Sequence, residues 1–124
     1  MNTVLGADLD DAARRKVLGL VGLGVRGRLV VVGAERVRIE ALKGAVQLAL
    51  VATDVSRHSL DKVLPVLRAR RIDVIEWPSA AELGDAVGRD TTAAVGIVDQ
   101  ALARGIRGAV AGAIPAGDAT RVSR

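Results

Sequence analysis

The sequence predicts an α/β domain in which helices cover both faces of a buried sheet. Short apolar runs at Val30–Val32, Val46–Ala52 and Ala93–Val98 alternate with longer, helix-patterned segments. Half of the 124 residues are hydrophobic, yet Phe and Tyr are absent and Trp77 is the single aromatic residue. A core of Val, Leu, Ile and Ala suits helices packed closely on a sheet. We therefore expect a three-layer α/β/α sandwich around a four-stranded, mostly buried sheet.

The first half of the chain predicts helix, strand, helix and strand. A helix begins after the aspartates near Asp10, and the glycines from Gly22 to Gly27 are expected to end it. Leu29 to Val32 predicts a strand, and Glu35 to Lys43 predicts a helix before Gly44. Val46 to Ala52 is short and apolar enough for a buried strand.

The second half predicts two further strands and three helices. Ser56 is expected to cap a helix that runs to about Arg71, and Val74–Trp77 predicts a strand. Ser79 is expected to cap the next helix, which ends at Gly88.

The last predicted strand is Ala93–Val98, and Asp99 is expected to cap a short helix that ends near Gly105. The following residues are rich in Gly, Ala and Pro with scattered charge. The sequence therefore predicts one domain over residues 1–106 and a flexible tail over residues 107–124.

The composition narrows the classes of partner and compartment. The chain carries a formal charge of +4 with a pI near 10.6, mostly from arginine, which favours a polyanionic partner. An arginine-rich and alanine-rich proteome would give the same bias. The chain lacks cysteine, its acidic start does not resemble a signal peptide, and its apolar runs are too short to span a membrane. We expect a cytoplasmic protein without disulfides.

The junction between the strand at Val30–Val32 and the helix after it is the main candidate site. Gly33 makes the turn, so backbone N–H groups and the positive end of a helix would point outward, which suits a phosphate or a base edge. Charged residues surround this junction and the loop after Gly88. The candidate RNA-binding residues are Arg26, Arg28, Gly33, Glu35, Arg36, Arg38, Lys43 and Arg89.

Three other motifs indicate alternatives that the sequence supports less well. Residues 22–27 match G-x-G-x-x-G, but a strand follows them where a dinucleotide site needs a helix. His58 stands near Asp54 and Ser56, although sequence neighbours at a helix start rarely align as a catalytic triad. Asp54 at a strand end is also typical of phospho-acceptor domains, but the acidic pair that holds their Mg²⁺ is missing. We predict no catalytic residue, cofactor or metal site.

Four motifs occur in order between Val17 and Ile106. They are Gly22–Arg26 with Val30–Glu35, Ala52–Ser56, Leu83–Gly88 and Val98–Ala103. In this order they resemble bacterial YlxQ-like proteins of the ribosomal protein L7Ae and L30e superfamily, which binds kink-turn RNA. The resemblance implies an α/β/α sandwich with a mixed sheet. It also implies an RNA surface that combines the turn at Gly33 with the loop after Gly88, which adds Thr91 to the candidate residues.

The resemblance also indicates a departure from the kink-turn pattern. Kink-turn binders carry Asn and Glu at the start of this helix and a Lys one turn later, which contact sheared G·A pairs. Glu35, Arg36 and Ile39 occupy these three places here, and the loop Arg89–Thr92 is more polar than the loop of those binders. RNA binding is therefore expected to survive better than kink-turn specificity.

We expect a non-enzymatic RNA-binding protein that associates with the ribosome or with another structured RNA. Ribosomal RNA and kink-turn RNA are the candidate targets. The alternative is a protein-interaction or assembly module on the same fold. A dinucleotide-dependent enzyme is a distant third hypothesis.

Overall fold

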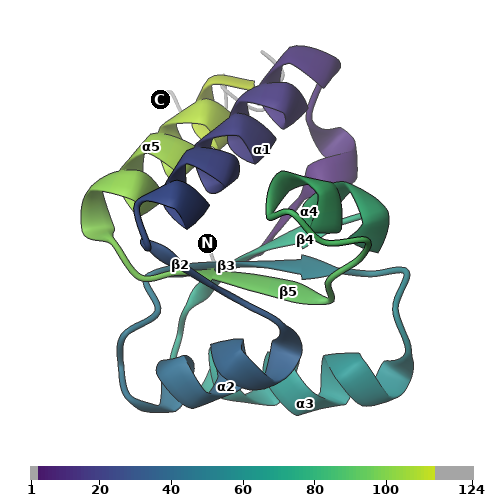
Figure 1. Ribbon diagram of the computed structural model, residues 1–124, viewed down its shortest axis with the longest axis vertical. Helices are drawn as coiled ribbons and strands as arrows, with labels where there is room; N and C mark the ends of the chain where they lie inside the picture. The colour runs from purple at the N-terminus through teal and green to yellow at the C-terminus, as the bar shows by residue number, and fades with distance from the viewer. Residues whose placement is uncertain (1–2, 114–124) are drawn as a thin grey trace, which may run out of the picture.

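Strands and helices alternate along residues 3–113, the part of the chain that this computed structural model describes (Figure 1). The strands are β1 (Thr3–Leu5), β2 (Val30–Val32), β3 (Leu48–Ala52), β4 (Asp73–Trp77) and β5 (Ala94–Ile97). The helices are η1 (Gly6–Asp8, a 3-10 turn), α1 (Asp11–Arg26), α2 (Ala34–Leu42), α3 (Arg57–Ala69), α4 (Ala80–Ala86) and α5 (Gln100–Ala113). Within these residues, no helix combines the length and the apolarity needed to cross a membrane.

The sheet has the strand order β1-β4-β3-β5-β2. β4 is parallel to β1 and β3, whereas β5 is antiparallel to β3 and β2, so the sheet is mixed. Helices α1, α4 and α5 cover one face, and α2 and α3 cover the other (Figure 1). The predicted alternation of strands and helices on two faces is confirmed.

The prediction of four strands is wrong, because β1 adds a fifth. Thr3, Val4 and Leu5 pair in parallel with residues 74–76 of β4. Three residues are too few to show an alternating pattern, and the acidic residues after them predict a loop or a helix start. The strand forms because its backbone groups find hydrogen-bond partners in β4, which lies far away in the sequence.

The β3 strand is buried on both faces and separates two apolar clusters. Leu48 and Leu50 pack toward α1, α4 and α5, while Ala49 and Val51 pack toward α2 and α3. All five residues of β3 are buried. This two-sided burial explains why the strand reads as a continuous apolar run rather than as an alternating one.

Helix α1 continues through glycines that the sequence predicts as its end. It passes Gly22 and Gly24, and Gly27 is its C-cap. A Cβ added at Gly24 would lie 2.5 Å from Leu102 Cδ2 and 2.8 Å from Val30 Cγ1, so this glycine lets α5 and β2 approach α1. The G-x-G-x-x-G match therefore lies largely within a helix, where its glycines serve packing, and it does not form a phosphate-binding loop.

Helix α5 is longer than predicted and corrects the boundary of the tail. It continues past Gly105 to Ala113, where a flexible tail from residue 107 was expected. Arg107 Nη2 donates a hydrogen bond to the Gln47 carbonyl oxygen at 2.8 Å, and Val110 is buried in the core. Residues 107–113 therefore belong to the domain. Residues 114–124 lie outside the described part of the chain.

Two glycines of α1 provide a matched test of this packing. Gly24→Ala is expected to lower the free energy of unfolding by about 1–3 kcal/mol, because the new methyl group overpacks against Leu102 and Val30. Gly19→Ala is expected to raise it by about 0.5–1 kcal/mol, because Gly19 is exposed and an added Cβ meets no atom within 4 Å. Urea denaturation of both variants measures these changes, and equal effects would contradict the assigned role of Gly24.

Candidate nucleic-acid interface

The turn before α2 and the loop before β5 lie next to each other at one end of the sheet. Gly33 N donates to the Ala94 carbonyl oxygen at 2.8 Å, and Ala52 N donates to the Ala93 carbonyl oxygen at 2.8 Å. We call this the Gly33 end; β2, β3 and β4 finish there and β5 begins. The antiparallel direction of β5 thus places two segments that are distant in sequence side by side.

Gly33 is required at its position by backbone conformation. Its φ of +104° lies in the left-handed region, which side chains other than glycine adopt at a cost, while an added Cβ would meet no atom within 4 Å. Gly33 is also the N-cap of α2, and it provides no side-chain hydrogen bond to the first turn. The positive end of α2 is therefore left without a side-chain cap.

The first two turns of α2 carry two arginines, and among the described residues only Arg38 is ion-paired. Arg38 donates to Glu35 through Nη2 at 2.6 Å and through Nε at 3.2 Å. The hydrogen bond from Arg38 lowers the pKa of the Glu35 carboxyl and, reciprocally, raises the pKa of Arg38. Arg36 is exposed and makes no ion pair within residues 3–113. Arg36 can therefore contact a ligand without breaking an ion pair such as that between Arg38 and Glu35.

The loop that carries Arg89 and Thr91 is held tightly against α4. Arg89 N donates to the Gly84 carbonyl oxygen at 2.7 Å, and Thr92 N donates to the Ala80 carbonyl oxygen at 3.1 Å. A Cβ at Gly84 would lie 2.6 Å from Thr91 Cα, so only glycine allows this approach. The Leu83–Gly88 motif therefore positions the loop, while Arg89 and Thr91 remain exposed.

Asp54 fixes the start of α4 and so supports the same loop. Its Oδ1 accepts a hydrogen bond from Ala80 N at 2.8 Å, beside the Ser79 hydroxyl that caps the helix. Ser56 Oγ accepts from Ser59 N at 3.2 Å and caps α3. With Asp54 and Ser56 engaged in these caps, the residues around His58 do not form the geometry of a triad.

Trp77 does not offer a platform for stacking bases. It is fully buried, and its Nε1 donates to Glu82 Oε1 at 2.9 Å. Arg14 lies over the ring at 5.6 Å from the centroid and binds the same Glu82 oxygen at 2.7 Å. The aromatic ring therefore belongs to the contact between α1, α4 and β4.

Three predicted site residues do not lie at the Gly33 end. Arg26 and Arg28 precede β2, and Lys43 follows α2, so all three lie where β2 and β3 begin. At this end Val98 N donates to the Leu29 carbonyl oxygen at 2.9 Å. A strand of five residues such as β3 spans ~17 Å. The expectation of one basic neighbourhood around Gly33 is thus wrong for these residues.

Arg57 is a cation at the Gly33 end that the motifs do not mark. It is the first residue of α3, it is exposed, and it follows the turn that begins after β3. Its sequence position next to a helix cap indicates only a local role. The direction of β3, which ends at the Gly33 end, is the signal that would have placed it there.

Acidic and histidine side chains do not gather into a metal site in the part of the chain described. No group of three or more His, Asp or Glu side chains there could hold a metal ion.

Comparison with known proteins identifies the family to which the chain belongs. The sequence profile of the Ribosomal protein L7Ae/L30e/S12e/Gadd45 family matches residues 15–105, and the chain belongs to this family. A comparison with curated proteins finds no match.

Two solved structures share the fold. A protein with unknown function from Bacillus halodurans has a TM-score of 0.70 at 27% identity, covering 77% of this chain and 96% of its own. The 15.5kD RNA binding protein of Giardia lamblia has a TM-score of 0.70 at 20% identity, covering 84% of this chain and 89% of its own.

The support that Asp54 gives to α4 can be tested directly. Asp54→Ala is expected to lower the free energy of unfolding by about 1–2 kcal/mol, because Ala80 N loses its acceptor. The amide of Thr92, bonded to the same residue, should exchange its hydrogen faster. Asp54→Asn retains an acceptor oxygen and should stay within about 0.5 kcal/mol of the parent. Urea denaturation and amide exchange measure both effects; equal losses in the two variants would contradict this role.

Proposed function

We propose that the protein binds structured RNA through the Gly33 end of the sheet and does not catalyse a reaction. The observation that carries this proposal is the hydrogen bond from Gly33 N to the Ala94 carbonyl oxygen at 2.8 Å, which fixes the start of β5 beside the start of α2. The N-terminus of α2 at this contact has no side-chain cap, and Arg36 in its first turn and Arg89 in the loop before β5 are exposed and make no ion pair with the residues of the described range 3–113. Both features suit phosphate groups and base edges.

Membership of the family supports RNA as the polyanion. The family description includes ribosomal proteins, and one structural neighbour is named an RNA binding protein. Ribosomal RNA, or another structured RNA, is therefore the target that we propose first. Phosphate and shape contacts would supply most of the affinity, because the one aromatic residue of the chain is buried.

Kink-turn selectivity is expected to be weak. Glu35, Arg36 and Ile39 stand where the resemblance places Asn, Glu and Lys, and the Glu35 carboxylate is held by Arg38. A matched bidentate contact to a base edge is worth about 1–3 kcal/mol of discrimination, which these residues would not reproduce. Arg36 can still donate two hydrogen bonds to a guanine edge.

The proposed surface predicts which arginines matter. Arg36→Gln and Arg89→Gln should each weaken RNA binding and reduce the slope of log K against log salt by about one, as expected for one lost phosphate contact. Filter binding with a kink-turn stem and an uninterrupted duplex measures both quantities. Lys16→Gln is the control, because Lys16 is an exposed cation beside Gly108 and Gly112 on the outer side of α1 and α5. Equal losses in all three variants would place the RNA elsewhere.

Removing the negative charge from the same turn should have the opposite effect. Glu35→Gln is expected to strengthen RNA binding and to increase the salt slope by about one, because Arg38 is released and a repulsive carboxylate is lost. The same filter-binding assay measures the change. Weaker binding by this variant would mean that the Glu35 carboxylate itself accepts hydrogen bonds from a base.

A protein-interaction module is the second candidate, and one observation favours it. Ile39 and Leu42 leave 37% and 43% of their surface exposed on α2, within two turns of Arg36. Apolar side chains in such a place suit contact with another protein. Light scattering that finds a tight oligomer, together with absence of RNA binding, would favour this candidate over the first.

A further inference from the structure

Helices α1 to α4 end in the same backbone motif. In each, the backbone N–H groups of the two residues after the C-cap donate hydrogen bonds to carbonyl oxygens near the end of the helix. The first of these two residues has a positive φ. The bonds that span five residues are Leu29 N to Gly24 O (2.8 Å), Ala45 N to Glu40 O (3.0 Å), Ile72 N to Leu67 O (2.9 Å) and Arg89 N to Gly84 O (2.7 Å).

Two of these four helix ends place arginine where glycine is expected. Gly44 and Gly88 occupy the left-handed position after α2 and α4, with φ of +79° and +80°. After α1 and α3 the same position is held by Arg28 and Arg71, with φ of +59° and +56°. Glycine adopts this conformation without strain, whereas arginine does not. Strained residues that a chain retains tend to mark functional sites.

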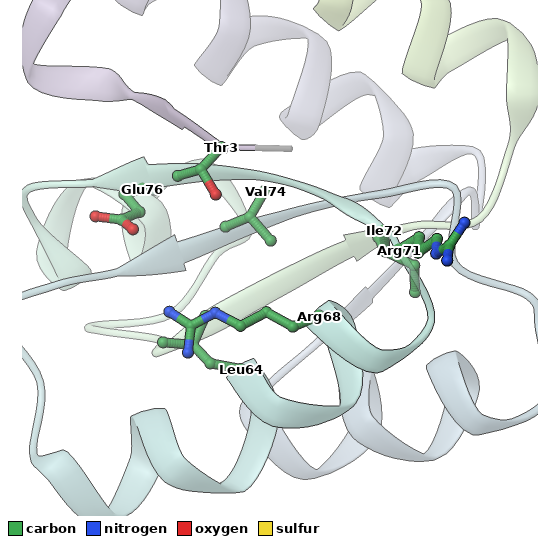
Figure 2. Close-up of a pocket in the computed structure, with 7 residues that line it drawn as sticks. All are labelled: Thr3, Leu64, Arg68, Arg71, Ile72, Val74 and Glu76. Atoms are coloured by element: carbon green, nitrogen blue, oxygen red, sulfur yellow. The ribbon is translucent and has the colours of Figure 1, made fainter. Parts of the chain in front are cut away.

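Both strained arginines lie at the end of the sheet opposite Gly33, which we call the Arg28 end. Arg28 leads into β2 and Arg71 into β4, and both strands begin at this end. In Figure 2 the side chain of Arg71 extends past the start of β4, while that of Arg68 lies back along α3 beneath Val74. Arg28 and Arg71 are exposed, as are Arg26 and Arg70 beside them in sequence.

The carboxylates at the Arg28 end are already engaged. Asp73 is bonded by Arg107 at 3.3 Å, Glu40 by Lys43 at 3.4 Å, and Asp99 Oδ2 accepts from Leu102 N at 2.8 Å. The four arginines 26, 28, 70 and 71 make no ion pair within residues 3–113. The Arg28 end therefore carries four exposed arginines that no described carboxylate pairs.

Stabilisation of the helix ends does not account for Arg28 and Arg71. A cation does suit the negative end of a helix, but Arg26 and Arg70 already provide one each. Arg26 lies within α1, and Arg70 caps α3 with an ordinary φ of −90°. A second arginine in the strained position adds charge at the surface, where a polyanion could use it.

We propose that Arg28 and Arg71, together with Arg26 and Arg70, form a second phosphate-binding surface that contacts a separate segment of the RNA bound at the Gly33 end. This inference rests on the proposed function. β2 and β4 are separated by β5 and β3, which sets their starts ~14 Å apart at ~4.8 Å per strand. Contacts to phosphates position RNA without reading its sequence, so this surface adds affinity and salt dependence rather than specificity.

The double variant Arg28→Gly/Arg71→Gly separates this role from a structural one. Its melting temperature should equal or exceed that of the parent, because glycine relieves the backbone strain at both positions. Its affinity for an RNA stem long enough to reach both ends of the sheet should fall about tenfold at ~0.1 M salt, with a salt slope lower by ~1.5. Arg28→Lys/Arg71→Lys retains the charge and should recover most of the affinity. Lys16→Gln again serves as the control.

The outcomes distinguish this inference from the proposed function. Unchanged affinity and salt slope in the glycine variant, with a loss in Arg36→Gln, would overturn the second surface and leave the proposed function standing. A loss in the glycine variant without one in Arg36→Gln or Arg89→Gln would place RNA at the Arg28 end alone, which would overturn both the role of the Gly33 end and the inference that one RNA contacts both ends. Absence of salt-dependent RNA binding by the parent protein would overturn both proposals.

Discussion

The antiparallel insertion of β5 between β3 and β2 determines where the candidate residues lie. Because β5 runs against its neighbours, the loop before it meets the turn after β2, and the Gly33–Ala94 hydrogen bond joins them. A parallel β5 would have placed that loop at the opposite end of the sheet. The extended β2 strand itself separates Arg28 from Gly33, although only four residues lie between them in sequence. The direction of β5 therefore assembles the Gly33 end, and the course of β2 keeps Arg28 at the other end of the sheet.

Much of the fold could be predicted because local patterns and tertiary packing agree. The apolar run at β3 is buried on both faces, as a continuous hydrophobic strand should be. The sequence mispredicts helix ends where tertiary packing, and not local preference, determines how far the helix continues. Helix α1 keeps Gly24 because α5 and β2 approach it closely, although glycine locally favours an end to the helix. Helix α5 continues because Ile106 and Val110 reach the core, while its glycines lie on the exposed side.

The candidate site was only partly predictable, for a related reason. Gly33 and the start of α2 are adjacent in sequence, so a local motif identifies them. The position of Arg89 depends on Gly84 and Asp54, which act through hydrogen bonds and close contacts that spacing does not reveal. The sequence misplaces Lys43, because the nine-residue helix α2 carries it to the other end of the sheet. Sequence proximity identified the charged residues but not the direction in which each one faces.

The pairing of β1 has a practical consequence for handling the protein. Its three residues cover one side of β4, which otherwise would present unpaired backbone groups along the edge of the sheet. A construction that trims the chain to the span matched by the family, from residue 15, would remove β1 and expose that edge. Exposed edges of this kind template strand pairing between molecules. Residues Thr3–Leu5 therefore make the edge of the sheet a strand of three residues in place of the five-residue β4, although the family match does not include them.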